Sequence, residues 1–248
     1  MDNREYQRMR QYEDEYWWYH GLRSLTVMMI ARYCVRPRPL LLDAGCGTGG
    51  QLAWLRKHLP YVAPAGVDLV PEAMQSTQRR GFRNLARASV MRLPFPDDAF
   101  DIVTSMDVLY IQGVDDISAL REMRRIVRPG GLLLLNLPAF EFLRGAHDVA
   151  IRTRHRYRRS EVRALLAETG YHIELLSYWN MTLLPVVAVA RWLSRFAPHT
   201  EATSDFRPIP ARVSAVLKWL ICGEVNTLRW FSLPAGVSIF AVARKVDE

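Results

Sequence analysis

The 248-residue sequence predicts an α/β fold in which seven strands form one sheet. Short apolar runs alternate with amphipathic stretches between about Leu40 and Leu137, which is typical of strand-helix-strand units around a parallel sheet. The first apolar run ends in a cluster of glycines. Half of the residues are hydrophobic, which is enough for one sizeable core.

The first half of this core has clear local signals. PLLLDAG (39–45) reads as a buried first strand that ends at the glycines. A helix is predicted over 49–58, because apolar residues recur at helical spacing at Leu52, Leu55 and Leu59. PAGVDL (64–69) predicts the second strand, and Pro71 suits the first turn of the next helix.

The second half continues the pattern. Apolar runs predict a short third strand near 85–88, a fourth at 99–108 and a fifth at 132–138 after the turn RPGG. The amphipathic stretches between and after them predict helices over 118–127 and 160–168. YHIELLSYW and GVSIFAVARK supply the sixth and seventh strands, at 171–179 and 236–245.

The flanks differ from this core in composition. Residues 1–35 read as two amphipathic helices joined near WWYHG, and we expect them to form a lid. The core spans 36–179. A helical insertion rich in tryptophan, proline and apolar residues covers 180–233, and 234–248 returns to the sheet as its last strand.

Charge and cysteine content restrict the setting of the protein. The formal charge of +8 favours acidic partners in general but does not choose among them. No apolar run is long enough to span a membrane, and the N-terminus has no apolar signal-peptide core. Cys34, Cys46 and Cys222 have neither zinc spacing nor a disulfide framework. We therefore expect no metal and a reducing, cytoplasmic location.

The glycine cluster LLDAGCGTGG (41–50) predicts a ligand site. Gly45, Gly47 and Gly50 give the pattern GxGxxG directly after a buried strand, where a backbone without side chains lets a nucleoside-containing ligand approach the start of a helix. A P-loop is excluded, because no Lys-Ser or Lys-Thr pair follows the glycines.

Two aspartates bear on the remaining ligands, and only the first of them separates a dinucleotide from S-adenosylmethionine. Asp43 would repel the pyrophosphate of a dinucleotide, whereas it suits S-adenosylmethionine, whose sulfonium and ammonium are cationic. Asp68 ends the second strand, where a carboxylate can accept both ribose hydroxyls of either ligand. The alternatives are structural: a turn-forming role for Asp43 and a helix-start role for Asp68.

Four blocks in order carry a family resemblance: LLDAGCGTGG, GVDLVPEAM, LPFPDDAFDIVTSMDVLYI and EMRRIVRPGGLLLLNLP. Together they resemble the class I S-adenosylmethionine-dependent methyltransferases, in particular the branch that includes the ubiquinone and menaquinone biosynthesis enzymes. The resemblance covers roughly 40–138 and implies a seven-stranded Rossmann-like sheet. The flanking segments look like those of a bacterial subgroup with varied substrates.

By position, the resemblance implies a set of cofactor contacts. The methionine part would lie against Gly45, Cys46 and Gly47, and the ribose and adenine against Asp68 and Leu69. Ser89 stands where the family usually has the aspartate that binds the adenine amino group, so Val90 and Met91 are expected to share that recognition. Met106 and Asp107 would line the sulfonium end and the mouth of the substrate site.

Candidate general bases are few. His147, which Asp148 could orient, and His155 follow the fifth strand, and histidine titrates in the useful range. Surface loop histidines are the other interpretation of both. Transfer of a methyl group from a sulfonium requires chiefly alignment and exclusion of water.

The aromatic N-terminal segment is the most informative flank. Trp17, Trp18, Tyr19 and His20 would be costly to expose, so we expect them to pack over the cofactor or the substrate, with Trp18 on the cofactor side. Arg23 would meet the methionine carboxylate. The alternative is a helix packed on the core. Further candidates for the substrate pocket are Tyr110, Tyr178 and Asn180.

Partners follow from the remaining segments. The basic run RTRHRYRR (152–159) is interpreted as a solvated approach to a helix and not as a nucleic-acid contact. The insertion suits an apolar cap over the substrate pocket, a homodimer interface or peripheral contact with a membrane. The cap is the default interpretation, and it predicts a partly hydrophobic or aromatic acceptor.

The sequence thus predicts an enzyme that moves a methyl group from S-adenosylmethionine to a small or medium-sized acceptor in specialised biosynthesis. Whether oxygen, nitrogen or carbon is methylated stays open. A nicotinamide-dependent oxidoreductase and a non-catalytic S-adenosylmethionine-binding protein remain as alternatives, because a fold does not determine a function.

Overall fold

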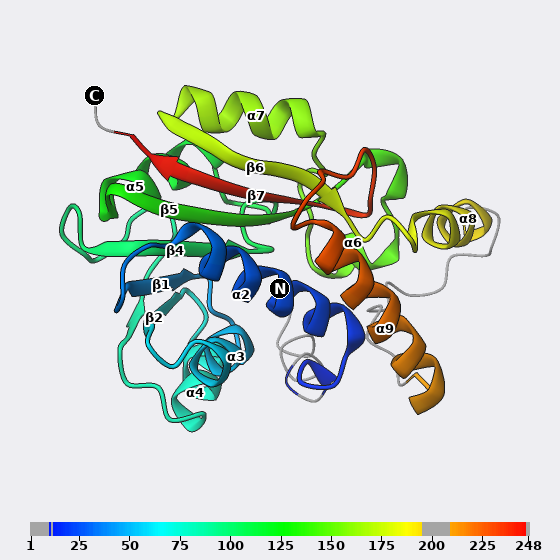
Figure 1. Cartoon of the computed structure of the whole chain (residues 1–248), viewed down its shortest axis with the longest axis horizontal. Coiled ribbons are helices and arrows are strands. Elements are labelled where there is room, and N and C mark those ends of the chain that lie inside the picture. The colour runs from blue at the N-terminus through cyan, green and yellow to red at the C-terminus, as the bar shows by residue number, and fades with distance from the viewer. Residues whose placement is uncertain (1–9, 11, 195–208, 247–248) are drawn as a thin grey trace.

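A seven-stranded sheet forms the centre of the protein, seen in a computed structural model that describes residues 10, 12–194 and 209–246 (Figure 1). The strand order is β3-β2-β1-β4-β5-β7-β6, and only β7 runs antiparallel to its neighbours. The strands are β1 (Leu40–Ala44), β2 (Ala63–Asp68), β3 (Leu85–Arg87), β4 (Phe100–Met106), β5 (Val127–Pro138), β6 (Tyr171–Trp179) and β7 (Ser238–Lys245). The predicted α/β fold with a seven-stranded Rossmann-like sheet is confirmed.

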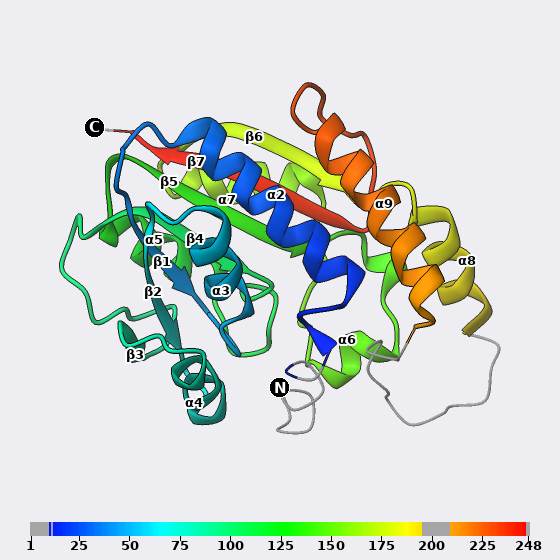
Figure 2. The ribbon, with the colours of Figure 1, turned by 60° about the horizontal axis from the view of Figure 1, so that its bottom comes forward.

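Helices cover both faces of the sheet, and each face has its own apolar cluster (Figures 1 and 2). One cluster joins the sheet to α2 (Trp17–Tyr33), α3 (Gly50–His58), α4 (Pro71–Arg79) and α9 (Ala211–Thr227). The other joins it to α5 (Asp116–Ile126) and α7 (Arg159–Glu168). The remaining helices are η1 (Glu141–Leu143), α6 (Ala146–Ala150) and α8 (Leu184–Ser194).

Local sequence explains the elements of the core. The central strands are buried on both faces, so they are almost continuously apolar, as in LLLLNLP of β5. At the start of α5, the Asp115 side chain accepts a hydrogen bond from the Ser118 N–H and satisfies one of the free donors at that end.

Two local expectations differ in detail from the structure. The segment WWYHG opens α2, and a turn at 13–15 separates it from helical residues at 10 and 12; most of the residues before it lie outside the described part of the chain. RPGG lies within β5, where the register against β4 is irregular between Phe100 and Ile102, so that β5 begins at Val127. A turn-forming sequence has been accommodated as an irregularity in a long strand.

The insertion is attached to the sheet unevenly. α9 packs along α2 and buries Ile221 and Val225, whereas α8 has no buried residue. Glu224 of α9 is buried and accepts hydrogen bonds from the backbone N–H groups of Met181 and Thr182, both at 3.0 Å. This carboxylate therefore fixes the chain between β6 and α8. No helix in the described ranges is both long and apolar enough to cross a membrane.

The polar residues singled out by the sequence lie together at the carboxyl ends of the parallel strands. Asp43 lies near the end of β1, Asp68 ends β2, and Asp107 follows β4. In sheets of this kind ligands bind beyond the carboxyl ends of the strands.

Replacement of Trp179 by alanine should reduce stability strongly. Its side chain is completely buried between the sheet and Trp18 and donates a hydrogen bond from Nε1 to Oδ1 of Asn136 at 2.7 Å. We expect the free energy of unfolding to fall by about 3–5 kcal/mol, as in other large-to-small substitutions of buried aromatic residues. Urea unfolding followed by circular dichroism measures it. Trp219→Ala is the matched control, because Trp219 is 74% exposed; an equal loss in both variants would contradict the expectation.

Candidate active site

The glycine turn between β1 and α3 is built from residues that need a left-handed backbone. Gly45 and Gly49 have φ angles of 90° and 81°, and a Cβ added at Gly45 would lie 2.3 Å from Cγ2 of Val108. The N–H groups of Gly45 and Cys46 both donate to the carbonyl of Val67, at 2.8 and 2.9 Å. The turn is therefore held against β2, and side chains are excluded from its first glycine.

Asp43 is a buried carboxylate beside this turn. Asp43 is only 2% exposed, and its Oδ1 accepts a hydrogen bond from the Thr104 hydroxyl on β4 at 2.8 Å. Within the described ranges no basic side chain forms an ion pair with it. Burial raises the pKa of Asp43 to about 7, although the Thr104 hydrogen bond opposes the shift, and the nearby Asp68 carboxylate adds to it. The Arg23 guanidinium lowers the pKa slightly without forming an ion pair with Asp43.

Asp68 connects the turn to the end of β2. Its Oδ2 accepts from the Gly47 N–H and its Oδ1 from the Val70 N–H, both at 2.9 Å. Burial raises the pKa of this carboxyl, and the two backbone donors counteract the shift. Each oxygen keeps a further lone pair, so both can still accept from a ligand.

The segment predicted to contact adenine lies next to Asp68. The Ala88 N–H donates to the Asp68 carbonyl at 3.2 Å, so the turn at 89–92 begins at the end of β2. Ser89 Oγ accepts from the Met91 N–H at 3.2 Å, which engages the hydroxyl within its own turn. Val90 is buried, whereas Leu69 leaves 60% of its surface exposed beside Asp68. Leu69 thus offers an apolar surface at this position.

Asp107 follows β4 in an unusual conformation. Its φ is 61°, and its backbone N–H donates to the Asn136 carbonyl at 3.1 Å. The Asn136 side chain donates to Oδ1 of Asp107 at 3.0 Å and accepts from Trp179. Burial raises the pKa of Asp107 to about 7, against the effect of Asn136 and the Arg156 guanidinium. Met106, the residue before Asp107, is partly buried against the apolar cluster that joins the sheet to α2, α3, α4 and α9.

Two tyrosines gather around Asp107. Burial is the main cause that raises the pKa of both Tyr19 and Tyr110 well above the usual value, and the Asp107 carboxylate contributes to each shift. Arg156 is 8% exposed and binds both oxygens of Asp148, at 2.8 and 3.1 Å. Residues from α2, the end of β4 and the segment after α6 therefore meet here.

The N-terminal segment covers the start of α3 with charged groups. Nη2 of Arg23 lies 2.8 Å from Oε2 of Glu13, and both residues are at most 3% exposed. Glu13 also accepts from the Thr48 hydroxyl and from Arg80 Nη2, the latter at 2.6 Å. A Cβ added at Gly50 would lie 1.9 Å from Arg23 Nη2, so this ion pair rests directly on the helix. Arg23 is near the turn, as expected, and its partner is a carboxylate.

The other aromatic candidates lie at different depths. Trp17 and Trp18 are partly buried on the cluster under α2, and Trp18 lies 5.9 Å from Trp179 between ring centroids. His20 faces away toward Trp54 of α3, at 5.0 Å, and burial together with Lys218 lowers its pKa. The WWYH segment therefore sends only some of its side chains toward the site.

The remaining substrate candidates end β6. Tyr178 is buried, stacks on Phe140 at 4.8 Å and accepts through its hydroxyl from the Arg159 N–H. Asn180 is 2% exposed, and its Oδ1 has no hydrogen-bond partner among the described residues. An unsatisfied buried oxygen of this kind is rare and suits a ligand donor.

The candidate histidines lie apart from these contacts. His147 is on α6. His155 Nε2 lies 3.4 Å from Oε1 of Glu161, and its ring meets that of Tyr157 edge-on. Asp148, expected to orient one of them, binds Arg156 and the Gly145 N–H. The catalytic role of both histidines stays a prediction.

Several groups at the site were missed by the sequence reasoning: Glu13, Thr48, Arg80, Thr104, Asn136 and Arg156. Each acts through a partner distant in sequence, such as Glu13 and Arg80, so spacing gives no signal. Only Asn136 stands out in the sequence, as the polar residue within the apolar run LLLLNLP.

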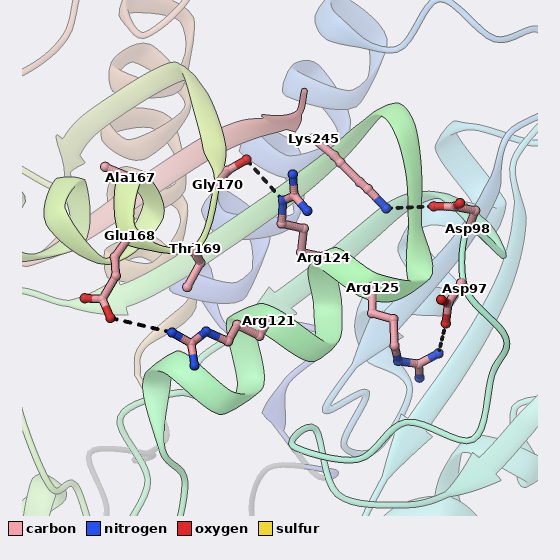
Figure 3. Close-up of a pocket in the computed structure, with 10 residues that line it drawn as sticks. All are labelled: Asp97, Asp98, Arg121, Arg124, Arg125, Ala167, Glu168, Thr169, Gly170 and Lys245. Atoms are coloured by element: carbon pink, nitrogen blue, oxygen red, sulfur yellow. Dashed lines mark hydrogen bonds and ion pairs between the residues drawn. The ribbon is translucent and has the colours of Figure 1, made fainter. Parts of the chain in front are cut away.

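A separate cavity of about 530 Å³ lies near the amino ends of the parallel strands (Figure 3). Six of its charges form three pairs: Lys245 with Asp98 at 2.7 Å, Arg125 with Asp97 at 2.7 Å and Arg121 with Glu168 at 3.9 Å. Arg124, the seventh, donates to the Gly170 carbonyl. The cavity is remote from the glycine turn and is not a candidate active site. The described residues contain no group of three or more His, Cys, Asp or Glu placed to hold a metal.

Comparisons with known proteins agree with this geometry. Residues 42–135 match the family described as "Methyltransferase domain". A demethylmenaquinone methyltransferase of Deinococcus radiodurans is 35% identical over 104 residues, which are 40% of this chain and 43% of that protein. The chain thus spans about two fifths of the length of the curated relatives that it matches.

Solved structures match over a longer stretch. The complex of the Haloferax volcanii Trm112 methyltransferase activator and a methyltransferase has a TM-score of 0.65 at 20% identity, covering 99% of this chain and 95% of that one. A geranyl diphosphate C-methyltransferase of Streptomyces coelicolor A3(2), solved with Mg²⁺, geranyl diphosphate and S-adenosyl-L-homocysteine, has a TM-score of 0.59 at 16% identity over 92% and 80% of the two chains. These likenesses show the fold. Residues 42–135 therefore form a methyltransferase domain.

Proposed function

We propose that the whole chain is a methyltransferase that uses S-adenosylmethionine to methylate a small or medium-sized, hydrophobic or aromatic acceptor. The observation that carries this proposal is the buried carboxylate of Asp43, which lies beside the glycine turn and forms no ion pair with a described residue. A buried carboxylate without a positive partner is costly, and a cationic ligand removes that cost.

The residues present fit this cofactor. Asp43 and the turn at 45–47 would hold its cationic methionine part, and Asp68 its ribose hydroxyls. Leu69 and the turn at 89–91 would lie against the adenine. Arg23 would bind the methionine carboxylate once Glu13 yields its place. When bound, the cofactor supplies an activated methyl group on a positively charged sulfur.

The acceptor would enter beside Asp107, where Tyr19, Tyr110 and Asn180 offer aromatic and polar surface. We propose Asp107 as the group that removes the acceptor's proton, ahead of His147 and His155, because its carboxylate is fixed by Asn136 and its pKa is about 7. An acidic thiol or phenol would need less of this help than an alcohol. The lid role of residues 1–35, with Trp17 and Trp18, belongs to the same proposal, as do a role in specialised biosynthesis and a cytoplasmic location.

Activity is tested by incubating the protein with S-adenosylmethionine and a panel of aromatic and isoprenoid acceptors, and measuring S-adenosylhomocysteine. Release that depends on one acceptor class supports the proposal. Tight cofactor binding without release across the panel would favour the non-catalytic alternative. Binding of NADH in preference to S-adenosylmethionine would favour the oxidoreductase.

Asp68→Ala should weaken binding of S-adenosylhomocysteine by at least about tenfold, because hydrogen bonds to a charged acceptor contribute about 1.5–3 kcal/mol each. Calorimetric titration measures this. Asp97→Ala is the control, since Asp97 is exposed and pairs with Arg125 near the amino ends of the parallel strands. Equal affinities in the wild type and Asp68→Ala would remove Asp68 from the ribose site.

Affinity for S-adenosylmethionine should rise with pH through about 7. The free protein holds a proton on Asp43 below its raised pKa of about 7, and that proton must leave before a cation can pair with the carboxylate. We expect the dissociation constant to increase by up to about tenfold per pH unit below that value. Asp43→Asn should bind weakly and with a flat profile; a flat profile in the wild type would contradict the role of Asp43.

The rate of transfer to an acceptor that needs a base should also rise as pH passes through about 7, because Asp107 accepts a proton only when ionised. Asp107→Asn keeps the shape and should lower kcat by about 10²–10⁴-fold at saturating cofactor. The paired variants His147→Ala and His155→Ala test the competing assignment. A loss in either of these with unchanged turnover in Asp107→Asn would transfer the role to histidine.

A further inference from the structure

The helices of the insertion carry an unusual amount of exposed apolar surface. On α8 the exposed side chains include Val186, Val189, Trp192 and Leu193, and on α9 Val213, Val216 and Trp219. Just after α9, Trp230 is 79% and Phe231 is 69% exposed. We call these nine residues the α8–α9 surface. Apolar surface of this extent marks an interaction site in most proteins.

This surface is not the outside of a cap that seals the core. α8 buries none of its residues, although its sequence is mostly apolar, and α9 uses a different side, with Ile221 and Val225, to pack on α2. Both helices lie at the same end of the molecule in two views, beyond the carboxyl ends of the parallel strands (Figures 1 and 2). The default interpretation of the insertion as an apolar cap therefore does not account for its exposed side.

Among the described residues of the insertion, the exposed charges are basic. Its described residues include four basic side chains, Arg191, Arg212, Lys218 and Arg229. The one acidic residue among them is Glu224, which is 6% exposed and bound to the backbone of Met181 and Thr182. Within 180–194 and 209–233, basic groups therefore accompany the exposed apolar groups, and the acidic residue is buried.

Three exposed tryptophans are part of the same surface: Trp192, Trp219 and Trp230. Tryptophan is enriched where hydrocarbon meets the polar headgroups of a bilayer, because its ring is apolar and its N–H needs a polar partner. Short helices with apolar and basic side chains bind in the plane of that interface. Neither helix is long enough to cross a membrane.

We propose that the α8–α9 surface docks the protein on an anionic lipid bilayer. The tryptophans and aliphatic side chains would enter the headgroup region, and the basic residues would meet lipid phosphates. Association of a second copy through the same surface would bring like charges together, which opposes it. Docking concerns a surface distinct from the glycine turn and does not depend on methyl transfer.

Flotation with lipid vesicles tests this proposal. The full chain should float with vesicles of equimolar phosphatidylcholine and phosphatidylglycerol, and bind weakly to phosphatidylcholine alone. Binding should fall as salt is added, because the basic residues act through the surface potential. The tryptophan fluorescence should shift to shorter wavelength on binding.

Variants identify the surface. Trp219→Ser combined with Trp230→Ser should weaken binding by at least about tenfold, and Arg212→Gln by about fivefold. Val35→Ser combined with Tyr61→Ser is the control, because both residues are exposed but lie near the amino ends of β1 and β2. Unchanged thermal unfolding shows that the variants are folded, since the altered side chains are exposed.

Three results would overturn the proposal. The first is failure of the wild type to float with anionic vesicles, and the second is equal flotation of the wild type and the double tryptophan variant. The third is a wild-type dimer in sedimentation equilibrium that the double tryptophan variant converts to monomer, which would make the surface a contact between copies. Methyl transfer in solution can persist in each case, so failure of docking is distinguishable from failure of the proposed activity.

Discussion

Two carboxylates buried at adjacent strand ends constrain the rest of the site. Asp68 accepts the N–H groups of Gly47 and Val70, and so fixes the glycine turn to β2. Asp43 receives only the Thr104 hydroxyl, and its pKa is raised to about 7 by burial. Because its proton is held more tightly in the folded state, Asp43 favours folding at low pH, and this contribution is lost as pH rises toward and through 7. Burial of Asp43 therefore lowers the stability of the fold near neutral pH.

The sequence predicted the core because its signals are local. Apolar runs, helical spacing and the glycines each depend on a few consecutive residues, and they placed β1, α3 and the turn correctly. The position of Asp68 followed from the end of an apolar strand. The same reasoning could not recognise Glu13 as the partner of Arg23 and Arg80, because these contacts join the N-terminus to α2 and to the end of α4. Nor does spacing reveal that Asp148 binds Arg156 instead of a histidine.

A hydrogen-bonded chain connects the candidate base to the core beneath α2. Trp179 donates to Asn136, which in turn donates to Asp107. Asn136 is completely buried within β5, and an amide there is tolerated because both of its polar ends are satisfied. The orientation of the Asp107 carboxylate thus depends on the packing of Trp179 against Trp18. The aromatic N-terminal segment can influence the site through this contact without touching an acceptor.

The Glu13–Arg23 pair has a consequence for how the protein exists without ligand. The Arg23 guanidinium is enclosed at the start of α3, and the buried Glu13, together with the exposed Asp14, is its counter-ion. On the proposed role of Arg23, an incoming carboxylate would replace Glu13, and the number of buried opposite charges would be conserved. The displaced Glu13 would still face Arg80 and Thr48, its other two partners. We therefore expect ligand binding at Arg23 and the position of the N-terminal segment that carries Glu13 to be coupled.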